Sequence, residues 1–142
     1  MRMLLIAAAG AAALALSIAA ASAAEMTFKT EMKAALETPP TTSTGTGEVT
    51  AAYDPATKML TWTITYSGLT GPATAAHFHG PAKAGDKAPP VVPIKGDLAS
   101  PIKGTATLTD EQAKDLQAGL WYFNVHTAKF PDGELRGQLA GQ

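Results

Sequence analysis

The segment from Lys58 to Ser67 alternates apolar and polar side chains with a period of two residues. Its apolar members are Leu60, Trp62, Ile64 and Tyr66, and threonines occupy the positions between them. Successive side chains of a β-strand point to opposite faces of the sheet, so this alternation predicts a strand with one apolar and one polar face. Such a strand needs a second layer over its apolar face, which narrows the fold to β-rich architectures.

Turn-forming residues divide the rest of the chain into similar short segments. Asp54-Pro55 begins a predicted turn, so residues 48–53 and 58–67 are expected to pair as a β-hairpin. Stretches rich in glycine and proline separate further expected strands at residues 74–79, 91–94, 103–108, 121–127 and 133–139. Short strands at this spacing are typical of an antiparallel β-sandwich or barrel.

One segment departs from the strand pattern and has the start and stop signals of a helix. Thr109 is a good N-cap residue, Gln112 follows three positions later, and Asp110 suits the positive end of the helix dipole. Gly119 is a suitable residue to end the helix. We therefore expect one short helix in an otherwise all-β chain.

The first 24 residues differ in composition from the rest of the chain. Arg2 precedes an alanine-rich apolar run that ends in small residues, which is typical of a bacterial secretory signal peptide. The alternative is a membrane anchor, which the small-residue end and the lack of a charged flank disfavour. We expect a signal peptide over residues 1–24, cleaved after Ala23 or Ala24, and a single mature domain over residues 25–142. The product would be periplasmic or secreted, with no membrane attachment after cleavage.

Composition excludes several kinds of site and partner. The chain contains no cysteine, so disulfides and thiolate-ligated metal sites such as blue copper are excluded. Its formal net charge is −1, which does not favour a nucleic-acid partner. The sequence also lacks a nucleophile elbow, a phosphate-binding glycine loop and an H-E-x-x-H motif, so a catalytic role is disfavoured.

All three histidines lie on the polar faces of expected strands. His77 and His79 are two residues apart, so they share a face, while Phe78 points to the opposite one. In residues 121–127 the alternating apolar side chains define the core face, and His126 points away from it. Two further residues on that polar face are candidates to contact the imidazoles: Tyr122 and Asn124.

Two imidazoles on one strand face, joined by a third from a neighbouring strand, predict a metal site with three nitrogen ligands. Imidazole suits copper and zinc, and we favour copper bound by His77, His79 and His126, with zinc as the alternative. Glu134 is a candidate fourth ligand, or an acceptor for a ligand's N–H group. The competing interpretations are three unrelated histidines and an ordinary surface ion pair between Glu134 and Arg136.

Four segments, in this order, resemble the CHRD domain family, which is named after the animal protein chordin and is frequent in bacterial exported proteins. They are LTWTITYSGL (60–69), AAHFHGPA (75–82), GLWYFNVHT (119–127) and GELRGQL (133–139). The resemblance implies an antiparallel Greek-key β-sandwich, immunoglobulin-like or superoxide-dismutase-like, over nearly all of the mature chain. It implies no established bacterial activity. Dismutase activity is not expected, because the chain lacks the bridging histidine and the additional ligands that such an enzyme needs.

Three functions are compatible with these observations. The first is an exported metal-binding module, with copper favoured at the three-histidine site. The second is a non-catalytic interaction domain of the envelope or extracellular matrix, which would bind an envelope protein without metal. The third is a small copper-dependent redox enzyme. The first and third require the three imidazoles to lie within about 5 Å of one another, since ligands of one ion cannot be farther apart.

Overall fold

The computed structural model describes residue 17 and residues 23–141. The predicted signal peptide, residues 1–24, lies almost entirely outside the described residues and stays a prediction. Within the described part of the chain, no helix combines the length and apolar character that crossing a membrane requires.

The described chain consists of eight strands, one α-helix and one short 3₁₀ helix. In chain order they are β1 (Met26–Lys33), η1 (Ala34–Leu36), β2 (Thr46–Asp54), β3 (Met59–Ser67), β4 (Ala73–His79), β5 (Pro90–Pro93), β6 (Ile102–Thr107), α1 (Asp110–Gln117), β7 (Tyr122–Thr127) and β8 (Leu135–Gln138). Every strand expected from the sequence is present, with ends that differ by one or two residues. The β2–β3 hairpin confirms the predicted turn after Asp54.

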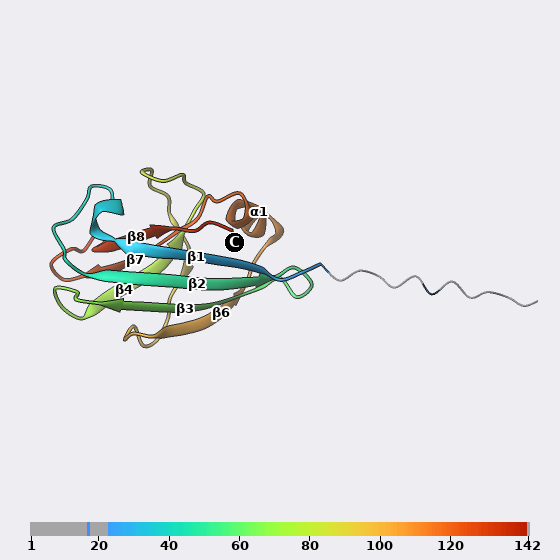
Figure 1. The fold of residues 1–142 in the computed structure, drawn as a ribbon, viewed down its shortest axis with the longest axis horizontal. Coiled ribbons are helices and arrows are strands. Elements are labelled where there is room, and N and C mark those ends of the chain that lie inside the picture. Colours follow the sequence, from blue (N-terminus) through green and yellow to red (C-terminus); the bar gives the residue numbers. More distant parts are fainter. Residues whose placement is uncertain (1–16, 18–22, 142) are drawn as a thin grey trace, which may run out of the picture.

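The strands form one sheet in the order β5-β4-β7-β8-β1-β2-β3-β6, and all of the pairings between them are antiparallel. The sheet folds over so that β4, β7 and β8 lie behind β1, β2, β3 and β6 (Figure 1). The two halves join where β8 pairs with β1, through Lys33 and Arg136. The chain crosses between the halves after β3, after β5 and after β6. The structure therefore confirms the all-β, antiparallel Greek-key sandwich with one short helix.

The apolar faces of the two halves form a single core. On β3, Leu60, Trp62 and Ile64 are 0%, 6% and 0% exposed, as the period-two alternation predicts. The Trp62 ring meets Phe78 of β4 across the core, with ring centroids 5.2 Å apart. Trp121 is also fully buried. Core formation thus orients β4 so that the residues flanking Phe78 point outward.

The outer face of β7 and β8 is covered by the loop between β4 and β5. The Arg136 guanidinium donates hydrogen bonds to the backbone carbonyl oxygens of Asp86, at 2.7 Å, and Lys83, at 3.4 Å. Gln138 donates to the carbonyl of Ala82 at 2.8 Å. The alternative interpretation of Glu134 and Arg136 as a surface ion pair is wrong. Both residues are buried, at 0% and 2% exposure.

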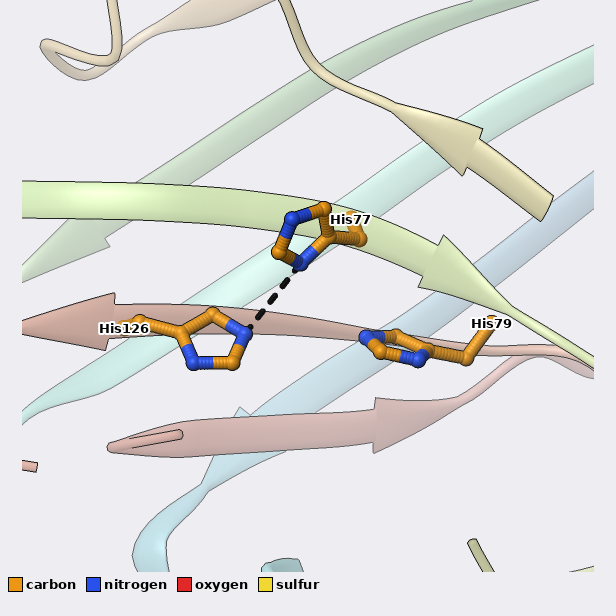
Figure 2. A group of neighbouring side chains, drawn as sticks. All are labelled: His77, His79 and His126. Atoms are coloured by element: carbon orange, nitrogen blue, oxygen red, sulfur yellow. Dashed lines mark hydrogen bonds between the residues drawn. The ribbon is translucent and has the colours of Figure 1, made fainter. Parts of the chain in front are cut away.

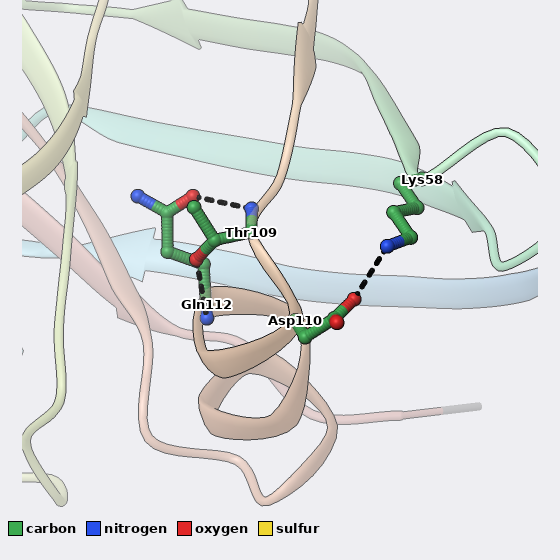
Figure 3. A network of polar contacts seen from close by, with 4 residues as sticks. All are labelled: Lys58, Thr109, Asp110 and Gln112. Atoms are coloured by element: carbon green, nitrogen blue, oxygen red, sulfur yellow. Dashed lines mark hydrogen bonds and ion pairs between the residues drawn. The ribbon is translucent and has the colours of Figure 1, made fainter.

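The N-terminus of α1 has the capping box that the sequence predicts. The Thr109 hydroxyl accepts from the backbone N–H of Gln112 at 3.1 Å, and the Gln112 side chain accepts from the backbone N–H of Thr109 at 2.9 Å (Figure 3). Asp110 also pairs with Lys58 at 2.8 Å, which ties the helix start to the β2–β3 turn. Past the helix, Gly119 has φ +77°, the left-handed conformation expected of a terminating glycine.

Replacing Thr109 with alanine is expected to lower the free energy of unfolding by about 1 kcal/mol, because the N–H of Gln112 loses its acceptor. Urea denaturation measures this change. Thr109→Ser keeps the hydroxyl and serves as the matched control. Equal destabilisation by both substitutions would show that the cap contributes nothing.

Candidate metal centre

Two adjacent antiparallel strands bring the three histidines together. His77 and His79 lie on β4, and His126 lies on β7. In the register of this pair, Asn124 is opposite His77, and His126 is opposite Ala75. The three rings and the Asn124 side chain therefore share the outer face of these strands, and Figure 2 shows the rings converging there.

One nitrogen from each ring lies close to the spacing that a single ion requires. The three candidate ligand atoms all lie within 4.8 Å of one another. The tightest recorded contact joins Nδ1 of His77 and Nε2 of His126, which are 3.2 Å apart (Figure 2). Ligands at about 2.1 Å from one ion span at most about 4.2 Å, so the widest pair must move closer before both nitrogens can bind the same ion. The predicted grouping of the three histidines is confirmed, while metal binding itself stays a prediction.

Backbone carbonyls set the tautomers of two of these rings. Nδ1 of His79 lies 2.8 Å from the carbonyl oxygen of Ala88, and Nδ1 of His126 lies 2.8 Å from that of Pro131. A carbonyl can only accept, so each Nδ1 carries the proton and donates it. A neutral imidazole holds one proton, which leaves a lone pair on Nε2 of both rings, directed at the centre of the group. Metal-binding histidines have this arrangement, with the second ring N–H held by a carbonyl or carboxylate.

Burial favours the neutral form of two rings. His79 is only 8% exposed, and burial lowers the pKa of its imidazole. Burial also lowers the pKa of His77, with a further contribution from the neighbouring His126 and His79. Metal ions bind neutral imidazole. The environment therefore holds these rings in the protonation state that a metal site needs.

Tyr122 and Arg136 fix the orientation of His79. The Tyr122 ring stacks on the His79 ring, with centroids 4.6 Å apart and planes 3° from parallel. The Arg136 guanidinium lies 3.5 Å from the centre of the same tyrosine ring. Because Arg136 is itself held by loop carbonyls, the stack is anchored to the loop that covers β8.

Glu134 lies outside the histidine group. Its carboxylate accepts hydrogen bonds from the hydroxyls of Ser43 at 2.8 Å and Thr127 at 2.7 Å, and from the backbone N–H of Thr70 at 3.0 Å. Among the described residues it makes no ion pair with Arg136. Its oxygens are engaged by these donors, so the structure supplies no contact between Glu134 and the imidazoles.

Glu37 is a neighbour of the site that sequence reasoning missed. It follows η1, is 7% exposed, and one carboxylate oxygen, Oε1, has no hydrogen-bond partner among the described residues. Burial raises the pKa of this carboxyl, and contacts with Asn124 and Arg136 partly offset that effect. A glutamate before a proline-rich loop carries no sequence signal of such a position, because loop packing alone brings it there.

A small pocket gives the site an opening. Its volume is about 190 Å³, and its lining includes His79, His126 and Asn124, together with Glu37 and Lys87. An ion or small molecule can therefore approach the two Nε2 atoms from this side. The pocket lining carries both an acidic side chain, Glu37, and a basic one, Lys87.

The fold and the site together define a class: an antiparallel β-sandwich that carries three converging imidazoles on the outer face of two adjacent strands. The family model described as CHRD domain matches residues 28–139. The chain belongs to the CHRD domain family, and the matched region contains all three histidines. No curated protein and no solved structure shows significant similarity to the chain.

Proposed function

We propose that this protein is an exported metal-binding module that holds a copper ion through His77, His79 and His126. The observation that carries the proposal is the pair of backbone carbonyls, at Ala88 and Pro131, that hold the Nδ1 protons of two rings. Without those acceptors either tautomer would be available. With them, the Nε2 lone pairs are directed inward before any ion arrives, which lowers the cost of organising the site.

Copper is favoured over other ions by the chemistry of the donors. Imidazole nitrogen suits both copper and zinc, and for nitrogen sites Cu²⁺ lies at the top of the divalent affinity order. Zinc is the alternative, since three histidines with one open position is also a zinc arrangement. The composition of residues 1–24 supports export, and cell fractionation of the expressed protein would test that part of the proposal.

Removing one imidazole is expected to weaken metal binding strongly. The mature protein should bind about one Cu²⁺ or Zn²⁺ by titration calorimetry, and His77→Ala or His126→Ala should reduce the affinity by roughly 100-fold or more, since each removes one of three nitrogen ligands. The chain has three histidines in all, so no other imidazole can substitute.

Lys103→Ala, an exposed substitution on β6, is a suitable control and should leave the affinity unchanged. Circular dichroism of each variant separates loss of the site from loss of the fold. Undiminished binding in folded His77→Ala and His126→Ala proteins would rule out the three-histidine site. It would leave the metal-independent interaction domain as the better account.

A further inference from the structure

We infer that the side-chain oxygen of Asn124 is the fourth ligand of this metal site, and that the buried side chain of Glu37 holds the Asn124 amide in the ligating orientation. The inference rests on the proposed function and adds a fourth ligand to the three histidines. Asn124 is 3% exposed and lies on β7 opposite His77, at the centre of the group.

The first support is the spacing of the donor atoms. Oδ1 of Asn124 lies 2.9 Å from Nε2 of His79 and 3.0 Å from Nε2 of His126. Nε2 of His126 is in turn 3.2 Å from Nδ1 of His77. Ligands bound tetrahedrally at about 2.0–2.1 Å are separated from one another by about 3.3 Å. Three of the six donor pairs therefore lie near the spacing of a four-coordinate site, and the three imidazole nitrogens all lie within 4.8 Å of one another.

The second support is the distribution of protons. Because Nδ1 of His79 and of His126 donates to a backbone carbonyl, the neutral rings have no proton left for Nε2. Two nitrogen lone pairs then face the lone pairs of the Asn124 oxygen at hydrogen-bond distance. Such a contact is unfavourable when nothing lies between the atoms. A cation bound by all of them converts this repulsion into coordination. The lone pair of His126 also accepts from Nδ1 of His77, whose proton must move to Nε2 of the same ring before Nδ1 can bind an ion.

The third support is the position of Glu37 on the other side of the amide. Glu37 contacts the Asn124 side chain, and its carboxyl group and the amide nitrogen of Asn124 lie against the same turn at Gly133. A carboxyl oxygen that carries no proton accepts hydrogen bonds, so it favours the amide nitrogen of Asn124 toward itself and the amide oxygen toward the imidazoles. The reverse amide orientation would place two acceptors against each other.

Gly133 provides the space for this contact. Its φ is +127°, and a Cβ at this position would lie 2.7 Å from Nδ2 of Asn124 and would also collide with Oε1 of Glu37. The backbone turn between β7 and β8 thus approaches both side chains closely, and only glycine fits.

The donor set also favours divalent over monovalent ions. Three imidazoles and an amide oxygen, without thiolate or thioether, suit Cu²⁺ or Zn²⁺ rather than Cu⁺. The inference is therefore that the site binds a divalent ion in an N₃O environment.

Asn124→Leu, which removes the oxygen at similar volume, tests the inference directly. We expect it to lower Cu²⁺ affinity by about 10- to 100-fold and to alter the electron paramagnetic resonance spectrum of the copper-loaded protein. Asn124→Asp keeps an oxygen at the same position and should retain more of the affinity. Unchanged affinity and an unchanged spectrum in folded Asn124→Leu protein would overturn the inference.

Glu37 is a positioning residue, so its variants need a different comparison. Glu37→Leu removes the acceptor for the amide and should lower Cu²⁺ affinity by about tenfold, whereas Glu37→Gln keeps a carbonyl acceptor and should restore it. Circular dichroism should show both variants folded. Equal Cu²⁺ affinities in the wild type and both variants would show that Glu37 does not position the Asn124 amide.

A measurement on the wild type keeps the inference testable if a variant fails to fold. Zn²⁺ is diamagnetic, so nuclear magnetic resonance of the zinc-loaded protein should show a large shift of the Asn124 side-chain amide resonances. Zinc binding without that shift would contradict ligation by Asn124 while leaving the three-histidine site intact. No binding of either ion by the wild type would instead refute the proposed function.

Discussion

Replacing Phe78 with alanine is expected to lower the free energy of unfolding by about 4 kcal/mol. Phe78 is fully buried. Its ring centroid lies 5.2 Å from that of Trp62, 4.8 Å from that of Phe123 and 5.8 Å from that of Trp121. Because these rings belong to both halves of the sandwich, the cavity left by alanine cannot close by a local shift.

Urea denaturation followed by tryptophan fluorescence measures this effect. Leu36→Ala is a control, because Leu36 is 45% exposed and its loss should cost less than about 1 kcal/mol. A loss below about 1.5 kcal/mol for Phe78→Ala would show that neighbouring core side chains move in to fill the cavity. The two flanking histidines point to the opposite face, so the folded variant should still bind metal.

Replacing Glu134 with glutamine is expected to lower the free energy of unfolding by about 2 kcal/mol at neutral pH. The buried carboxylate accepts from Ser43, Thr127 and the backbone of Thr70. A glutamine side chain presents an amide N–H₂ where at least one of these donors points, so a buried donor is left unpaired. Urea denaturation at pH 7 gives the magnitude.

The effect of Glu134→Gln should depend on pH in a defined direction. Burial alone would raise the pKa of Glu134, but hydrogen bonds from Thr70, Thr127 and Ser43 together lower it by more, so the net pKa lies below its ordinary value. A group whose pKa is lower in the folded state stabilises the fold above its unfolded pKa of about 4.3 and loses that contribution as pH falls through the folded pKa.

The difference in unfolding free energy between the wild type and Glu134→Gln should therefore shrink as the pH falls from 7 toward 3. The subtraction cancels the titration of other carboxyls, which the two proteins share. A difference that stays constant across this range would mean that Glu134 contributes through shape rather than through charge.

The sequence was informative wherever the determining interaction is local. Strand parity follows from the period of the backbone, so the alternation of β3 and the shared face of His77 and His79 were predictable. The capping box of α1 was predictable for the same reason, since Thr109 and Gln112 are three residues apart. His126 required one more step, the assumption that β4 and β7 are neighbours, and the structure confirms that pairing.

The remainder depends on contacts between segments far apart in the chain. Parity correctly placed Arg136 on the face opposite the core, but it could not reveal that the β4–β5 loop covers that face. Glu37 reaches Asn124 only because the segment after η1 folds toward the turn at Gly133. The Glu134 side chain likewise finds partners at Ser43 and Thr70, in two separate loops. No local pattern encodes these associations.

The pairing of β1 with β8 has a consequence for how the chain reaches this fold. Strand β1 pairs with β2 on one side, but its neighbour on the other side is β8, far along the chain, so the sheet is incomplete until β8 has been synthesised. Folds dominated by such distant pairings typically form in milliseconds to seconds, slower than helical domains of similar size. A nascent chain ending before Leu135 lacks the strand that joins β7 to β1. The half of the sandwich that carries the histidines therefore has no strand pairing with the other half until β8 has been made.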